Sequence, residues 1–325
     1  MTNLDKKTIL VTGSAGFIGF HTAKKLLEIG ANVVGVDNFN DYYDPKLKEA
    51  RNEILEKFIT FKLYRGDLSD ESFVNSIFKD NKIDKICHLA AQAGVRYSLV
   101  NPGAYVKANL IAFVNILEAT RNNNIKDFVY ASSSSVYGNN KKVPFSVDDP
   151  VNEPISLYAA TKKSDELMAY SYHHLFGINT TGLRLFTVIG PFGRPDMAPI
   201  LFADAINKGD AIKVFNFGKM RRDFTYIDDI VQGIILALDN TDGYQLFNLG
   251  NNKPVELEYF ISCLEKELGK AAIKDYKEMQ PGDVLETYAD IEHTKEVLGW
   301  EPKVSIEEAA HLFTEWYKEF YGNKR

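Results

Sequence analysis

The sequence predicts an α/β protein built on a doubly wound parallel sheet, and two observations support this prediction. Short apolar runs alternate with longer amphipathic stretches through the first half of the chain, and a glycine-rich turn joins the first run to the first stretch. Parallel strands covered on both faces give this alternation because a helix must connect each strand to the next. We expect strands at residues 8–12, 33–37, 59–64, 85–89 and 128–132, and helices at 17–29, 70–79, 101–122 and 158–175.

The second half of the chain is less regular. After about Thr187, loops rich in Pro and Gly alternate with short helical stretches, and no Ser/Gly linker separates the halves. We expect residues 1–186 to form the larger domain. Residues 187–325 should form mainly a smaller, substrate-binding lobe packed against the sheet, with chain crossings back to the first domain.

Composition excludes several classes of protein. The 325 residues carry a net charge of −6 with dispersed charges, which lacks the basic footprint of a nucleic-acid-binding protein. No run approaches the ~20 apolar residues of a membrane helix, and because the first residues run directly into a predicted strand we expect no signal peptide. The two cysteines, Cys87 and Cys263, and six histidines show no metal-ligand spacing. We expect a cytoplasmic protein without metal, in which Cys87 is buried.

A glycine-rich turn predicts a dinucleotide site. Gly13, Gly16 and Gly19 lie between the first strand and the first helix. Glycines let the backbone approach a pyrophosphate, and the N–H groups at a helix N-terminus bind it. Asp37 ends the second strand, where a carboxylate binds the adenosine ribose and repels a 2′-phosphate. The cofactor is therefore expected to be NAD.

Three residues form the expected catalytic group. Tyr158 and Lys162 are four residues apart on a predicted helix and share one face. A lysine ammonium lowers the pKa of a nearby phenol, which makes it a base for a hydroxyl proton. The serines at 132–135 end a predicted strand and could hydrogen-bond the substrate oxygen. Each signal is weak alone, but their combination in chain order with the glycine turn favours a catalytic site.

The glycine spacing resembles that of the short-chain dehydrogenases/reductases, specifically their extended branch. The resemblance implies a Rossmann-type domain, with Ser133 as the catalytic serine. The expected cofactor contacts are then Gly13, Gly16, Phe17, Ile18, Gly19, Asp37, Asn38, Asp67, Leu68, Ala90, Ala91, Gln92, Asn109, Tyr158 and Lys162. Related 4,6-dehydratases carry Asp and Glu where this chain has Ser134 and Ser135, and decarboxylases carry a Glu. Both reactions are therefore disfavoured.

Four segments, at residues 93–98, 156–163, 190–197 and 218–229, resemble UDP-glucuronate 4-epimerases. This resemblance implies that Arg222 contacts the diphosphate and Asp283 the uridine ribose. Arg194, with Ser134, Ser135 and Thr187, could hold the sugar carboxylate by charge-assisted hydrogen bonds. Arg96 is a weaker candidate on the substrate loop. The alternative for Arg194 is a surface pair with Asp196.

The expected reaction is C4 epimerisation of UDP-glucuronate through a 4-keto intermediate. A UDP-glucose or UDP-N-acetylglucosamine 4-epimerase is the main alternative, and a UDP-glucuronate decarboxylase is a weaker one. A non-catalytic NAD-binding protein is disfavoured because Ser133, Tyr158 and Lys162 are all present. A net dehydrogenase would consume NAD stoichiometrically. The resemblance further implies polysaccharide biosynthesis and a homodimer formed through the helices at 101–122 and 158–175.

Overall fold

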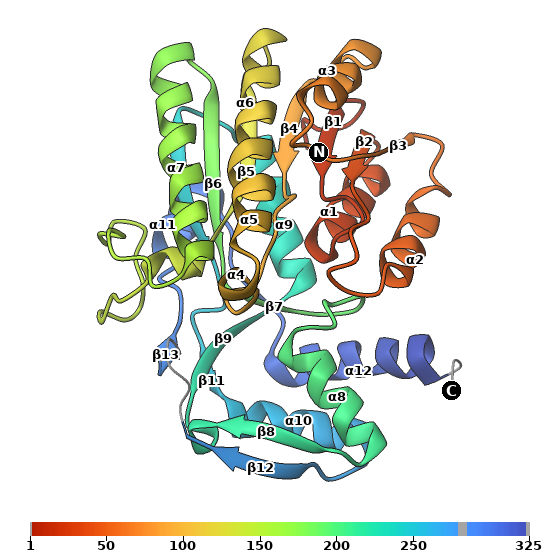
Figure 1. The fold of residues 1–325 in the computed structure, drawn as a ribbon, viewed down its shortest axis with the longest axis vertical. Coiled ribbons are helices and arrows are strands. Elements are labelled where there is room, and N and C mark those ends of the chain that lie inside the picture. The colour runs from red at the N-terminus through yellow and green to blue at the C-terminus, as the bar shows by residue number, and fades with distance from the viewer. Residues whose placement is uncertain (1, 279–284, 323–325) are drawn as a thin grey trace.

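A computed structural model describes residues 2–278 and 285–322. Its centre is a seven-stranded sheet in the order β10-β6-β5-β4-β1-β2-β3, in which every neighbouring pair is parallel (Figure 1). The strands are β1 Thr8–Thr12, β2 Asn32–Asp37, β3 Phe61–Arg65, β4 Lys85–His88, β5 Asp127–Ser133, β6 Asn179–Leu185 and β10 Tyr244–Leu249. The predicted parallel α/β sheet is therefore confirmed.

Helices cover both faces of this sheet, so the core has two halves. Because successive strand residues point to opposite faces, Ile9 and Val11 of β1 pack with one set of helices and Leu10 packs with the other. The first set includes α1 Phe17–Glu28 and α9 Ile227–Asp239. The second set includes α3 Glu71–Asp80, α6 Ala112–Asn122 and α7 Leu157–Phe176. Cys87 of β4 is fully buried, as predicted.

In the first half, the structure corrects the start of one predicted strand and adds one helix that was not predicted. The third strand begins at Phe61, because Ile59 is fully exposed in the turn before it. The helix α2, Lys46–Leu55, was not predicted. Its buried face contains only two apolar side chains, Leu47 and Leu55, beside the polar Lys48, Arg51 and Asn52, so it lacks the usual apolar periodicity.

The helix predicted at residues 101–122 is also irregular. It begins at α5, Pro102–Tyr105, passes through the π-helical segment η1, Val106–Ile111, and continues as α6. The Asn101 side chain caps its start by accepting a hydrogen bond from the Ala104 amide at 3.3 Å. A π segment widens the helix and often marks a functional site. Asn109 lies in this segment and is 1% exposed.

A smaller lobe lies below the main sheet in Figure 1. Its strands are β7 Thr187–Ile189, β8 Ala211–Phe215, β9 Arg221–Tyr226, β11 Pro254–Glu256, β12 Ile273–Lys277 and β13 Glu286–Thr287, and its helices are α8 Ala198–Lys208, α10 Leu257–Leu268 and α12 Ile306–Gly322. Between these elements the chain returns to the main sheet, where α9 packs on α1 and β10 pairs with β6. The helix α11, Glu292–Leu298, contacts β10.

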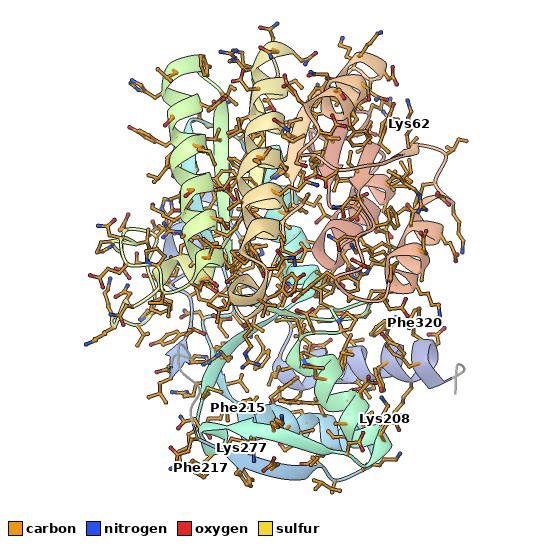
Figure 2. All side chains as sticks on the ribbon, in the orientation of Figure 1. Lys62, Lys208, Phe215, Phe217, Lys277 and Phe320 are labelled. Carbon is orange, nitrogen blue, oxygen red and sulfur yellow. The ribbon has the colours of Figure 1, made fainter. Side chains whose placement is uncertain are left out.

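Phe215, at the end of β8, and Phe217, just after it, mark the end of this lobe that is seen at the lower left of Figure 2. No helix among the described residues is both long and apolar enough to cross a membrane.

Candidate active site

A cavity of about 400 Å³ lies at the carboxyl ends of strands in the main sheet, where ligands of such sheets bind. Most of the predicted site residues line it. They are Gly13, Gly16, Phe17, Ile18, Gly19, Asp37, Asn38, Asp67, Leu68, Ala90, Ala91, Gln92, Ser133, Ser134, Ser135, Tyr158, Lys162, Thr187 and Arg194. The fold thus brings together residues that lie between Gly13 and Arg194 in the sequence.

The glycine turn packs too tightly for side chains. Gly13 has a φ of +69°, and a Cβ there would lie 2.9 Å from the Ala90 Cα. A Cβ on Gly19 would lie 2.0 Å from the Gly13 carbonyl oxygen. The turn leads into α1, whose first residues line the cavity and whose N-terminus has no side-chain cap. This arrangement leaves the positive end of the helix dipole available to an anion such as a pyrophosphate.

Asp37 ends β2 beside this turn. Its Oδ2 accepts a hydrogen bond from the Ala15 amide at 3.2 Å and its Oδ1 accepts one from the Phe39 amide at 2.8 Å. The Nζ of Lys48, on α2, lies 3.7 Å from Asp37 Oδ1. Burial lowers the pKa of Lys48, and the Asp37 carboxylate opposes that shift. The carboxylate is therefore fixed in direction before any ligand binds.

Beyond Asp37 and Asn38, four further residues of the same part of the chain were not predicted as site residues. Asn40, Tyr42, Tyr43 and Lys48 also line the cavity. The only signal was a polar and aromatic segment directly after the end of a parallel strand, where loops of this fold meet their ligands. Tyr42 packs against Tyr97, in the short helix α4 Tyr97–Val100, with ring centroids 4.8 Å apart.

Asn109 does not line the cavity, although the resemblance implied a cofactor contact. Its Oδ1 accepts from the Gln92 amide at 2.8 Å, and its Nδ2 donates to the Gln92 carbonyl at 3.1 Å and to Thr161 Oγ1 at 2.9 Å. Asn109 therefore joins the loop after β4 to the first turns of α7. These two segments present Gln92 and Tyr158 to the cavity.

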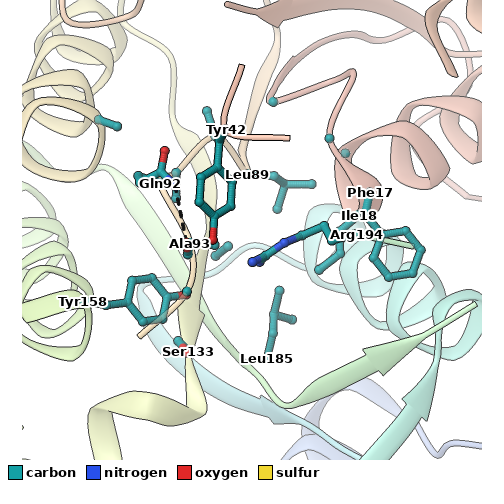
Figure 3. A pocket seen from close by; sticks show the side chains of 18 of the residues that line it. Phe17, Ile18, Tyr42, Leu89, Gln92, Ala93, Ser133, Tyr158, Leu185 and Arg194 are labelled. Carbon is teal, nitrogen blue, oxygen red and sulfur yellow. Dashed lines mark hydrogen bonds between the residues drawn. The ribbon is translucent and has the colours of Figure 1, made fainter. Parts of the chain in front are cut away.

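Ser133 and Tyr158 point into the same part of the cavity (Figure 3). Ser133 ends β5, and its Oγ accepts a hydrogen bond from the Ser135 amide at 3.2 Å. Tyr158 lies in the first turn of α7, which Ser156 caps by accepting a hydrogen bond from the Ala159 amide at 3.1 Å. The Ser132 hydroxyl is engaged elsewhere, since it donates to Glu166 at 2.7 Å.

Lys162 lies one turn beyond Tyr158 and is 2% exposed. Its Nζ donates to Asp165 Oδ2 at 2.6 Å, and the Asp165 side chain is fully buried. A buried ammonium is costly without a compensating charge. Asp165 supplies that charge and holds the lysine at the cavity wall. Asp165 was not predicted as a site residue, although a carboxylate three residues after a lysine on a helix is a recognisable pair.

Arg194 lines the cavity and also pairs with Asp196. Its Nε lies 3.0 Å from Asp196 Oδ1 and its Nη2 lies 2.5 Å from Asp196 Oδ2, with about one fifth of the side chain exposed. The Tyr42 hydroxyl donates to Asp196 Oδ2 at 3.1 Å. In Figure 3 the guanidinium extends toward the space between Tyr42 and Tyr158. The two expectations for Arg194 are therefore compatible.

Two further predicted substrate residues, Arg96 and Arg222, do not line this cavity. The Arg96 guanidinium stands over the Phe215 ring of the small lobe, 5.6 Å from its centroid. Arg222 Nη1 donates to the carbonyl oxygens of Arg221 at 3.0 Å and Leu285 at 3.4 Å. Asp283 lies outside the described residues. Within the described ranges, no group of three or more His, Cys, Asp or Glu side chains could hold a metal ion.

Comparison with known proteins agrees with this geometry. The profile of a family described as GDP-mannose 4,6 dehydratase matches residues 10–312. UDP-glucuronate 4-epimerase 4 of Arabidopsis thaliana is 45% identical over 98% of this chain and 77% of its own length.

Two solved structures are similar over nearly the whole chain. The UDP-glucuronic acid 4-epimerase of Bacillus cereus, in complex with UDP-glucuronic acid and NAD, is 35% identical with a TM-score of 0.90, over 97% of this chain and all of that one. The UDP-glucose 4-epimerase of Thermotoga maritima, with UDP-glucose, is 32% identical with a TM-score of 0.88, over 97% of this chain and 99% of that one.

Proposed function

The chain belongs to the GDP-mannose 4,6 dehydratase family of extended short-chain dehydrogenases/reductases, and we propose that it is an NAD-dependent UDP-glucuronate 4-epimerase. The observation that carries this proposal is the position of Arg194. Its guanidinium enters the cavity that also contains Ser133 and Tyr158. A cation there can form charge-assisted hydrogen bonds with the carboxylate of a uronate sugar, whereas a neutral sugar offers no charge to pair with it.

The cavity suits NAD. The glycine turn and the start of α1 would hold the pyrophosphate, and Asp37 would hold the adenosine ribose. Asp67 and Leu68 would line the adenine side, and Ala90, Ala91 and Gln92 the nicotinamide side. Bound there, NAD supplies an acceptor for the C4 hydride that can later return it to the opposite face of the sugar.

The chain's own residues would manage the proton. Tyr158 takes the C4 hydroxyl proton, and Lys162, one turn further along α7, supplies a positive charge on the same face of the helix. Ser133 hydrogen-bonds the same oxygen as it changes from alcohol to ketone. Because the proton returns from Tyr158 in the second half of the reaction, neither residue is consumed.

The 4-keto uronate is a β-keto acid, which loses CO₂ when its carboxylate bond aligns with the carbonyl π system. We propose that Arg194, Thr187, Ser134 and Ser135 hold the carboxylate out of that alignment. The serines also lack the acid and base that a dehydratase needs to eliminate water. The family name therefore does not describe the reaction proposed for this chain.

The principal alternative is a neutral-sugar 4-epimerase, since a UDP-glucose 4-epimerase has the same fold. The two functions are separated by incubating the purified protein with UDP-glucuronate and with UDP-glucose, without added NAD. We expect UDP-galacturonate from the first substrate and no net NADH. Conversion of UDP-glucose alone would contradict the proposal, and a UDP-pentose as the main product would indicate a decarboxylase.

We also propose a homodimer that forms through α6 and α7. These helices pack side by side and leave apolar side chains in solvent, which favours a protein interface. Exposed apolar residues of α7 are Leu167, Tyr170, Leu175 and Phe176, and those of η1 are Val106 and Ile111. A cytoplasmic location and a role in supplying galacturonate units for polysaccharides are further proposals of the same resemblance.

A further inference from the structure

The loop that carries Arg194 is anchored to the cofactor side of the protein. It runs from Gly190 to Arg194 and follows β7. Three carbonyl oxygens precede Arg194 in this loop, at Pro191, Phe192 and Gly193, and each accepts a hydrogen bond from α1 or α2. The helix α1 begins at the glycine turn, and α2 contacts that turn through Arg51. The same two helices therefore contact both the glycine turn and the loop that carries Arg194.

Arg51 of α2 makes the central contacts. Its side chain is fully buried. The Nη2 donates to the Phe192 carbonyl at 2.6 Å and to the Gly193 carbonyl at 3.4 Å. The Nη1 donates to the Ala15 carbonyl at 2.7 Å and to the Tyr43 hydroxyl at 2.8 Å. One rigid guanidinium therefore bridges the glycine turn, through Ala15, and the loop that ends at Arg194.

Other contacts hold the same loop. His21 of α1 hydrogen-bonds the Pro191 carbonyl from its Nε2 at 2.9 Å. Since a carbonyl only accepts, the imidazole donates from this nitrogen. Burial lowers the pKa of His21 to about 4, so the ring is neutral at physiological pH. The Phe192 ring packs against Phe20, Trp316 and Phe320, with centroids 5.1 to 5.5 Å apart (Phe320 is labelled in Figure 2).

We propose that Arg51 is a positioning residue, which fixes the distance between the cofactor turn and the Arg194 guanidinium. This inference rests on the proposed function, because it assigns Arg194 to the sugar carboxylate. The distance between the cofactor turn and the Arg194 guanidinium then stays constant. The sugar can therefore present C4 to the cofactor while Arg194 holds its carboxylate. A displacement of this loop would loosen the carboxylate without altering the diphosphate site.

Arginine suits this role better than lysine. A planar guanidinium has five donors in fixed directions and can serve two backbone segments at once, whereas an ammonium is a single point on a flexible stem. Arg51→Lys keeps the charge but cannot reproduce both pairs of hydrogen bonds. The variant therefore distinguishes the effect of the two pairs of hydrogen bonds from the effect of a positive charge at this position.

The test compares binding of UDP-glucuronate with binding of UDP-glucose, by calorimetry on the NAD-bound protein. The wild type should prefer the uronate. In Arg51→Lys we expect the dissociation constant for UDP-glucuronate to rise on the order of tenfold, the value for UDP-glucose to stay within about twofold, and a UDP-pentose side product to appear, since small displacements weaken a positioned contact strongly.

Arg65→Lys is the matched control. Arg65 lies on β3. Its guanidinium pairs with Glu49 of α2 at 2.7 Å and stands over the Phe39 ring, 3.9 Å from the ring centroid, rather than bridging the glycine turn and the Arg194 loop. It should leave the preference unchanged. His21→Ala gives a second test that does not depend on Arg51 folding correctly. The substitution removes the hydrogen bond from His21 to the Pro191 carbonyl. It should raise the dissociation constant for UDP-glucuronate, by a smaller factor than Arg51→Lys, and leave the value for UDP-glucose unchanged.

The outcomes separate the inference from the function on which it rests. A wild type without preference for the uronate would contradict the proposed function. A wild type that prefers it, with Arg51→Lys retaining the full preference, would overturn the positioning role alone. Equal weakening of both nucleotide sugars in Arg51→Lys and His21→Ala would also overturn it, because that result indicates general loosening of the fold.

Discussion

At the scale of single residues, the proposed chemistry depends on two cations that carboxylates hold in place. Asp165 fixes Lys162 behind Tyr158, and Asp196 holds Arg194 side-on through Nε and Nη2. The second pairing uses one edge of the Arg194 guanidinium, and an arginine carries five N–H donors in all, so the same group can also contact a ligand. Both pairs orient a charge before substrate arrives, which reduces the reorganisation needed during the reaction.

Tyr158→Phe tests the proposed base. The variant keeps the ring in its place but removes the phenol that exchanges the C4 hydroxyl proton. We expect turnover of UDP-glucuronate to fall about 10²- to 10⁴-fold, the range for loss of an acid–base group. Affinity for UDP-glucuronate should change little. A variant with near wild-type turnover would exclude Tyr158 as the base.

Arg194→Met tests the carboxylate contact. The substitution keeps a long side chain at the cavity but removes the charge, so KM for UDP-glucuronate should rise by about 10- to 100-fold, as expected for a charge-assisted hydrogen bond of 1.5–3 kcal/mol. A UDP-pentose product should accumulate as the β-keto acid loses CO₂. The products are resolved by NMR. Unchanged KM with no pentose would remove Arg194 from the substrate site.

At the scale of elements, the sequence predicted what local patterns determine. Four of the five strands in the first half lie where apolar runs indicated, and the glycine turn and Tyr158 follow from short motifs. The helix α2 was missed because it buries Lys48 and Arg51 rather than an apolar stripe. The partner of Arg51 lies about 140 residues away in the loop at Phe192, and no local pattern indicates such a contact.

The strand β4 makes stability depend on pH. His88 is 1% exposed, and its ring stacks on Phe128 with centroids 6.1 Å apart. Thr12 Oγ1 accepts from the Leu89 and Ala90 amides and lies 2.9 Å from His88 Nδ1, so the hydroxyl donates to that nitrogen. Burial, with a further contribution from the Lys162 charge, lowers the pKa of His88 to about 3.

The sign of the effect follows from proton binding. Between pH 6.5 and 3, His88 is protonated in the unfolded chain but not in the folded protein. The free energy of unfolding therefore decreases as the pH is lowered through this window. From pH 7 to 5 this residue should contribute a loss of about 2 kcal/mol. Urea unfolding of wild type and His88→Asn at both pH values measures it. Equal losses in the two proteins would contradict the assignment.

At the scale of the whole molecule, the cavity lies where the large sheet meets the small lobe, and the chain crosses between them repeatedly. The helix α9 and strand β10 belong to the second half of the sequence yet pack in the first domain. The boundary predicted at residue 186 therefore separates two parts of the sequence between which the chain crosses back, and it stays a prediction. In a single chain, apolar side chains of α7 are exposed to solvent. The proposed homodimer would bury them.

The homodimer is tested by light scattering coupled to gel filtration. We expect a mass of twice 36.7 kDa. Replacing both Leu167 and Tyr170 with Glu should give a monomer, because charges would be buried in the apolar contact between the α7 helices. A monomeric wild type would contradict the proposal. A double variant that stays dimeric would place the interface elsewhere.

In the proposed reaction, the C4 hydrogen leaves the sugar and returns to the same carbon within one active site. The most direct measurement is NMR of the product formed from UDP-glucuronate deuterated at C4, in ordinary water and without added NAD. We predict UDP-galacturonate with the deuterium still at C4 and no accumulated NADH. Loss of the label to solvent, or a labelled UDP-pentose as the main product, would contradict the account.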